Sequence, residues 1–357
     1  MIQLSLQRFM CRTAAVRGPS RATLRMACRA AALLAACVAG PHAGAASSLE
    51  AITGVVGGPG GGSSPLGCGT FDPVPELSFF TFNTLVPRGG YGPCGYSGGY
   101  TTASAPTGPL NRNAGLGPVI LGPPGSPAGY FDGTADARAN YRSLGAAAHA
   151  NISGGLPESS LAMFESTGAA TFTDTLTASS PFVANITAGT VRYTFSVDGS
   201  LSSLGAPGPF LFGETYAVLD LQHQGGPVYE LLNAHVRRGG LGIISGNPPP
   251  AGWVTSTGSL SGGSTVEIEL PMVWGQPWDL KVGLLAWAYG TADTDFLTTA
   301  KLTGLELFDA GHNPVTTFSI TSASGTDYAA PVPEPSTGVL MFAGLAGLAG
   351  LARRRKR

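Results

Sequence analysis

The chain has 357 residues and a formal net charge of −1, and 11% of its residues are charged, against about 25% in an ordinary soluble domain. Between residues 46 and 330, nine basic residues face 20 acidic ones, so this body carries a net charge of about −11. A body of this charge is not expected to bind nucleic acid or an anionic membrane. Its many glycines and prolines favour short strands and turns over helices.

Residues 1–45 have the pattern of a secretory signal peptide. The first 29 residues contain six arginines and no acid, an apolar segment follows at 30–40, and small residues then precede Ala46. This order predicts cleavage between Ala45 and Ala46 after passage through the Sec export machinery.

Two features of this leader leave alternatives open. Met26 would give a leader of more usual length than Met1 does. The stretch that ends at Cys37 also fits a lipoprotein cleavage box, although the apolar segment before it is short.

Residues 46–134 are rich in Gly, Ser and Pro and are expected to form a loop-rich segment with one strand at 77–83. Cys68 and Cys94 are the two cysteines that remain after the leader is removed. In an oxidising compartment they are expected to form one disulfide, with two free thiols or a metal pair as alternatives.

Residues 135–330 are expected to form the main folded domain. The segment 135–151 alternates polar and apolar residues and favours a β-hairpin, although its alanines would also suit a helix. Apolar residues then recur at every second position in 191–197 and 266–270, and four further segments are also expected to be strands: 216–222, 281–289, 301–308 and 315–321. The turn cluster 309–314 is expected to join the last two as a hairpin. Strands with one apolar face predict an all-β, two-sheet antiparallel sandwich of jelly-roll or concanavalin-like form.

No strong catalytic site is evident in this domain. Four residues of one presumed hairpin are a weak candidate for a metal or acid–base site, and a solvated strand face is the favoured interpretation: Asp220, His223, Glu230 and His235. Asp293 and Asp295, placed in a loop, are a weak Ca²⁺ candidate without the rest of an EF-hand. No cofactor is otherwise expected.

Four tryptophans fall within one stretch of the chain: Trp253, Trp274, Trp278 and Trp287. Two of them on one concave face would stack on sugars, whereas core packing is the default expectation.

The C-terminal residues 331–357 contain three signals in a fixed order. Pro333, Glu334 and Pro335 form a stiff, extended motif, because proline fixes φ and removes a backbone donor. An uncharged apolar run from Thr337 to Ala352 follows and is expected to form a transmembrane helix of about 24 Å. The chain then ends in five basic residues, which place that end in the cytoplasm: Arg353, Arg354, Arg355, Lys356 and Arg357.

This combination resembles the PEP-CTERM sorting signal of Gram-negative bacteria. The resemblance covers about 26 residues and implies recognition by exosortase, a membrane-embedded cysteine transpeptidase. The helix would then be removed, and the product would be exported or attached at the cell surface. Before processing, the chain would be anchored in the inner membrane.

Three functions remain open on the sequence. The leading one is a non-enzymatic cell-surface or extracellular-matrix protein, which the family resemblance links to exopolysaccharide and biofilm formation. The second is a lectin-like carbohydrate-binding module, with exopolysaccharide as its partner. The third is a secreted glycan hydrolase, which requires two positioned carboxylates.

Overall fold

The computed structural model describes eight segments of the chain: 47–57, 75–81, 97–121, 129–153, 164–203, 213–238, 244–245 and 251–329. The signal peptide with its cleavage site at Ala45 and Ala46, the two cysteines Cys68 and Cys94, and the C-terminal signals at 331–357 lie outside the described residues. The structure of these parts of the chain stays a prediction.

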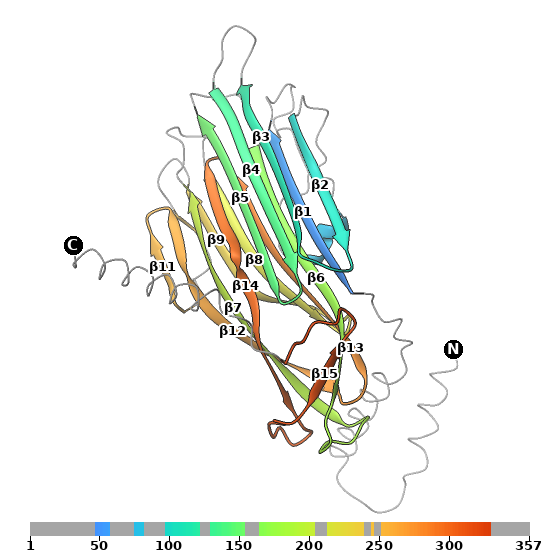
Figure 1. Ribbon diagram of the computed structural model, residues 1–357. Helices are drawn as coiled ribbons and strands as arrows, with labels where there is room; N and C mark the ends of the chain where they lie inside the picture. Colours follow the sequence, from blue (N-terminus) through green and yellow to red (C-terminus); the bar gives the residue numbers. More distant parts are fainter. Residues whose placement is uncertain are drawn as a thin grey trace, which may run out of the picture. The chain divides into compact units, whose positions relative to one another are not determined.

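Two antiparallel sheets form the described body (Figure 1). The first sheet has the order β10-β9-β8-β13-β6-β1-β2, and β15 also pairs with β6. Its strands are β1 (Ser48–Gly57), β2 (Ser97–Ala105), β6 (Phe164–Ser179), β8 (Gly213–His223), β9 (Val228–Arg238), β10 (Ile244–Ser245), β13 (Pro277–Tyr289) and β15 (Ser319–Ser322).

The second sheet has the order β11-β12-β7-β14-β5-β4-β3. Its strands are β3 (Leu110–Leu121), β4 (Gly129–Asn140), β5 (Ser143–Ser153), β7 (Ala188–Ser203), β11 (Trp253–Ser256), β12 (Ser259–Val273) and β14 (Ala292–Phe308). The prediction of an all-β fold with two antiparallel sheets is therefore confirmed.

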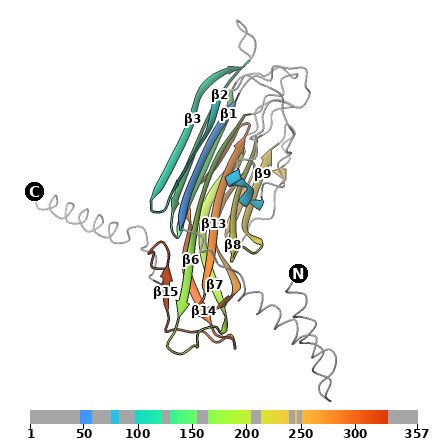
Figure 2. The same ribbon diagram turned by 90° about the vertical axis from the view of Figure 1, so that its right-hand side faces the viewer.

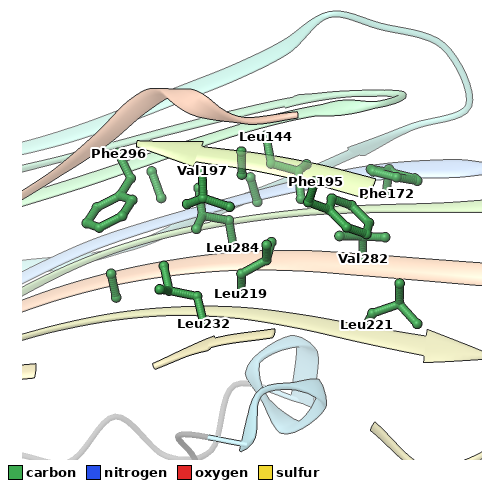
Figure 3. Close-up of a cluster of buried hydrophobic side chains, with 14 of the residues drawn as sticks. Leu144, Phe172, Phe195, Val197, Leu219, Leu221, Leu232, Val282, Leu284 and Phe296 are labelled. Carbon is green, nitrogen blue, oxygen red and sulfur yellow. The ribbon is translucent and has the colours of Figure 1, made fainter. Parts of the chain in front are cut away.

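Apolar side chains at alternate positions of the strands fill the space between the sheets. In β7, the buried side chains of Val191, Tyr193, Phe195 and Val197 face the core, while the intervening polar residues point outward. Figure 3 shows members of this core, including Phe172 and Phe195, lying between strands of the two layers.

Alanines let the sheets approach closely at one place. Three buried alanines of β4 and three of β5 line the core: Ala135, Ala137, Ala139, Ala146, Ala148 and Ala150. Gly168 of β6 lies across from them, and a Cβ added there would meet the backbone oxygens of Asp136 and Ala147, the latter at 2.6 Å. Backbone therefore packs against backbone at this point.

The first sheet is also covered on its outer face. A 3-10 helix, η1 (Pro75–Phe79), lies over β13 and β8 (Figure 2). A Cβ on Gly283 of β13 would lie 2.7 Å from the Phe79 ring and 2.8 Å from the Phe80 ring, so glycine makes room for both rings. These rings, with Ile52, Val218 and other residues, form a second apolar cluster on this face.

The strand expected at 77–83 is wrong, because residues 75–79 form this helix. Neighbouring residues of a strand point to opposite faces, whereas Phe79 and Phe80 both contact β13. The segment 46–134, expected to be loop-rich, also contributes β1, β2, β3 and the start of β4, and the expected boundary at residue 135 falls inside β4.

Two predicted hairpins are confirmed and one is wrong. β4 and β5 pair around the turn at Tyr141 and Arg142, and β8 pairs with β9. The turn at 309–314 exists and is held by the Asp309 carboxylate, which accepts hydrogen bonds from the backbone N–H groups of Gly311 and Asn313. The chain after it pairs with the end of β14 only briefly, through the bridge between Phe308 and Pro314 and the bond from the N–H of Val315 to the carbonyl oxygen of Leu307. The strand β15 then pairs with β6 of the other sheet, so the expected long hairpin does not form.

Replacing Gly168 by alanine should destabilise the body by about 1–3 kcal/mol, because the added methyl group has no space between the sheets. The urea midpoint measures this loss. Gly117→Ala is the matched control, since a Cβ at Gly117 meets nothing within 4 Å. Equal midpoints for the two variants would contradict the close approach of the sheets.

Candidate functional site

Aromatic and acidic side chains gather on the outer face of the first sheet, beside η1. The strand registers place Glu165 of β6, Tyr289 of β13, Glu214 of β8 and Arg237 of β9 in one row across four strands. The next row contains Thr167, Trp287, Tyr216 and His235. We call these two rows the outer aromatic face.

Four rings of this face form a continuous ladder. Tyr289 stacks on Trp287 at 5.8 Å between ring centroids, and Trp287 meets Tyr216 at 5.4 Å in a tilted contact. Tyr216 stacks on His235 at 3.9 Å with the ring planes 7° apart. Aromatic π-faces at strand spacing are the groups that stack on sugar rings in binding sites, and here they also stabilise one another.

The carboxylate of Glu214 organises one end of the ladder. It accepts hydrogen bonds from the hydroxyl of Tyr216 at 2.7 Å and from Nε2 of His235 at 3.0 Å, and Arg237 lies 3.9 Å away. Burial alone would raise the pKa of Glu214, but the bonds from His235 and Tyr216 outweigh it and lower this pKa. Burial and the Glu214 carboxylate together raise the pKa of Tyr216. Glu214 is therefore a fixed anion.

Glu165 marks the opposite end of the ladder and is almost entirely buried. Its Oε2 accepts a hydrogen bond from the indole Nε1 of Trp287 at 3.1 Å. Burial raises the pKa of Glu165 to about 8, although the Trp287 bond opposes this shift. Glu165 is thus a neutral acid at pH 7, two strands away from the anionic Glu214.

Asp220 and Glu230 hold Thr81, two residues after the end of η1. Asp220 accepts hydrogen bonds from the backbone N–H of Thr81 at 2.7 Å and from its hydroxyl, and that hydroxyl also contacts Glu230 at 3.1 Å. Burial raises the pKa of Asp220 to about 7 despite the bonds from Thr81. Asn233 donates to Glu230, while its own Oδ1 is buried without a hydrogen-bond partner. This unpaired acceptor lies beside the outer aromatic face.

The four-residue site expected in the β8–β9 hairpin is not assembled. His223 points between the sheets, where it contacts the hydroxyl of Tyr193 at 3.1 Å and the carbonyl oxygen of Pro271 at 2.9 Å. Burial lowers the pKa of His223 to about 4, so it is a neutral core residue. Asp220 and Glu230 face the other side with His235. The favoured interpretation, a solvated face, is also wrong for Asp220 and His223, which are both buried.

The Ca²⁺ candidates Asp293 and Asp295 lie in strand β14 and not in a loop. Asp293 is hydrogen-bonded to Nδ1 of His149, and this bond is the main cause of the raised pKa of His149. Asp295 accepts a hydrogen bond from the backbone N–H of Leu297. Within the described segments, no three His, Cys, Asp or Glu side chains are grouped so that they could hold a metal ion.

Core packing holds for three of the four tryptophans. Trp253, Trp274 and Trp278 belong to the cluster between the sheets, and Trp278 donates to the hydroxyl of Tyr193 at 2.8 Å. Trp287 alone lies on the opposite face of its sheet. Sequence reasoning singled out Trp287 and His235 but missed their neighbours Glu165, Glu214, Tyr216 and Tyr289. The alternation in 214–216 and 287–289 hints at a shared face, but the pairing of β8 with β13 is not visible in the sequence.

A family model, the PEP-CTERM protein-sorting motif, matches residues 331–356. The chain carries a PEP-CTERM motif. No curated protein and no solved structure matches the chain. The match confirms the resemblance seen in Pro333, Glu334 and Pro335.

The PEP-CTERM motif implies export, a C-terminal anchor and processing by an exosortase. The structure describes this PEP-CTERM protein up to Ala329, two residues before the matched region begins. Across the described segments, no helix is long and apolar enough to cross a membrane. The helix expected from Thr337 to Ala352 lies outside them.

The body of this PEP-CTERM protein should lose stability as the pH rises from about 4.5 to 8. Glu165 is protonated when folded and ionised when unfolded over this range, so the unfolded state binds fewer protons and is favoured as the pH rises. Asp220 adds a loss of the same sign up to about pH 7. Urea unfolding at several pH values measures the slope.

In the Glu165→Gln variant this slope should be clearly smaller, because the amide does not titrate. Glu267→Gln, at an exposed position of β12, is the control and should keep the parent slope. An unchanged slope in Glu165→Gln would contradict the neutral buried acid.

Proposed function

We propose that this PEP-CTERM protein is a non-enzymatic component of the cell surface or extracellular matrix, delivered by exosortase and linked to exopolysaccharide or biofilm. The observation that carries the proposal is the match to the sorting motif at 331–356, directly after a folded β-sandwich. The acidic body supports it, because a net charge of about −11 keeps a protein soluble outside the cell.

The side chains of the outer aromatic face also favour a non-enzymatic role. A glycan hydrolase needs one carboxyl group that acts as an acid and another that is free to act as a base or nucleophile. The Glu214 carboxylate is already bonded to Tyr216 and His235, and Glu165 is buried against Trp287. These contacts suit a structural or binding face better than a reacting pair.

In a host that has an exosortase, the exported protein should lose the segment from Thr337 to Arg357. Intact mass of the exported form measures this loss. Replacing Pro333, Glu334 and Pro335 together by alanine should leave the chain unprocessed in the membrane fraction. Three alanines at the exposed residues Ser261, Thr265 and Glu267 of β12 are the control and should leave processing unchanged. Exported protein that retains Arg357 would refute the sorting route.

A second function, carbohydrate binding, is favoured by the ladder from Tyr289 to His235. Such a face offers π-surfaces and hydrogen-bonding groups to a polysaccharide. On this hypothesis the protein would hold the matrix polymer through the outer aromatic face.

If the protein binds glycans there, Tyr289→Ala should lower retention on exopolysaccharide from the host by several-fold. Tyr130→Ala is the matched control, since Tyr130 is an exposed tyrosine of β4 in the other sheet. A polysaccharide pull-down with both variants makes the comparison. Equal retention of the two, or no retention of the parent protein, would count against the lectin.

A further inference from the structure

Strand β6 carries two partners on one flank, placed end to end. β1 pairs with residues Phe164–Thr173 of β6, and β15 pairs with its last residues, from Leu176 to Ser179. Both are antiparallel to β6, so they run in the same direction, and β15 pairs with the part of β6 that lies beyond Ser48, the first residue of β1 (Figure 2). Asp174 and Thr175 lie at the interruption between them.

Asp174 fills this interruption with a fully buried carboxylate. It accepts hydrogen bonds from the backbone N–H and the hydroxyl of Ser324 and from the hydroxyl of Tyr328, the last at 2.9 Å. The backbone N–H of Ala323 adds a bond to the carbonyl oxygen of Thr175 at 2.9 Å. Burial and the nearby Asp174 raise the pKa of Tyr328, so its hydroxyl stays a donor.

Arg142 holds the segment that contains Ser324 and Tyr328 by a further hydrogen bond, at Asp327. It occupies the β4–β5 turn with a φ of 68°, and its guanidinium donates to the carbonyl oxygen of Asp327 at 2.7 Å. The neighbouring Tyr141 donates to the carbonyl oxygen of Pro106 at 2.8 Å. We call residues 319–329 the docked segment, and the surface around the turn at Tyr141 and Arg142 the exit surface.

The docked segment ends close to the sorting signal. From Ala329 to Pro333 there are four residue steps, which span at most about 14 Å, and from Ala329 to Thr337 there are eight, at most about 29 Å. Ser48, the first residue of β1, pairs with Thr173 of β6, and Ser322 of β15 pairs with Leu176 of β6. These two positions on β6 are three residues apart, which is about 10 Å along the strand. Both ends of the described body therefore leave it at the exit surface.

We propose that the exit surface is the face that the folded body presents to the exosortase, and that the docked segment sets how far the sorting motif can reach. The inference rests on the proposed processing by exosortase. Because the motif directly precedes the predicted membrane helix, the chain is cut at the bilayer surface. The tether from Ala329 to Thr337 spans at most about 29 Å, so it keeps the exit surface close to the enzyme. Within this tether, four residues, 330–333, separate the body from Glu334.

The test shortens this tether without touching the matched motif. Deleting Ala329 and Ala330 removes about 7 Å of reach and leaves residues 331–356 intact. Processing, followed by intact mass after a pulse of synthesis in the exosortase host, should slow several-fold. Inserting Gly-Ser after Ala330 is the length control and should not slow it.

A second change releases the docked segment in the shortened chain. Ser324→Ala with Tyr328→Phe removes side-chain donors from Asp174, so the segment can detach and lengthen the tether. Processing of the shortened chain should return toward the parent rate, and limited proteolysis should cut between residues 319 and 329. The matched control is Ser104→Ala with Tyr130→Phe, which removes two exposed hydroxyls elsewhere on the body. This control should not restore the processing rate of the shortened chain.

The outcomes separate this inference from the sorting proposal. A parent chain that is never processed refutes the sorting route itself. If the parent is processed and the shortened chain keeps the parent rate, the docked segment does not limit reach. If the shortened chain is slow and release of the segment does not restore it, the loss comes from the altered sequence and the inference is wrong.

Discussion

The buried carboxylate of Asp174 is the interaction on which the end of the body depends. Three of its four hydrogen bonds come from Ser324 and Tyr328, and the fourth comes from the backbone N–H of Thr175. If residues 319–329 left β6, the three bonds from Ser324 and Tyr328 would be lost, and a typical intramolecular hydrogen bond contributes about 0.5–1.5 kcal/mol to stability. The last turn of chain before the sorting motif is therefore part of the fold and not a free linker.

The outer faces of the two sheets differ in chemistry, because η1 and an apolar cluster cover part of the outer face of the first sheet. β13 is buried along most of its length, since the core lies on one side and η1 with the outer aromatic face on the other. β7 of the second sheet alternates between buried and partly exposed residues, and Arg192 pairs there with Glu269 and Glu306. Ion pairs of this exposed kind contribute little to stability. A ring ladder next to a buried neutral acid and a fixed anion distinguishes the outer face of the first sheet from that of the second.

Local patterns in the sequence predicted the architecture where each strand has one apolar face. The alternation in 191–197 and in 135–151 predicted β7 and the β4–β5 hairpin correctly, although the pattern did not locate the turn at Tyr141 and Arg142. The strand at 77–83 failed because adjacent phenylalanines pack on a glycine, which no periodicity reveals. The hairpin after residue 308 stops after one bridge, because the partner of β15 is 140 residues earlier in the chain. The outer aromatic face has the same origin: Glu165, Tyr289 and Glu214 meet only through strand order. The jelly-roll or concanavalin-like form stays a prediction, whereas the sorting motif was readable because it is a local sequence signal.

The central claim is that the chain leading to the sorting motif is docked before it is processed. Hydrogen exchange on the full chain, in membranes of a host without exosortase, tests it most directly. The amides of Ala323 and Ser324, which bond Thr175 and Asp174, should be protected as strongly as neighbouring amides of β6. Exchange of residues 319–329 at the rate of an unstructured peptide, while β6 stays protected, would contradict the claim.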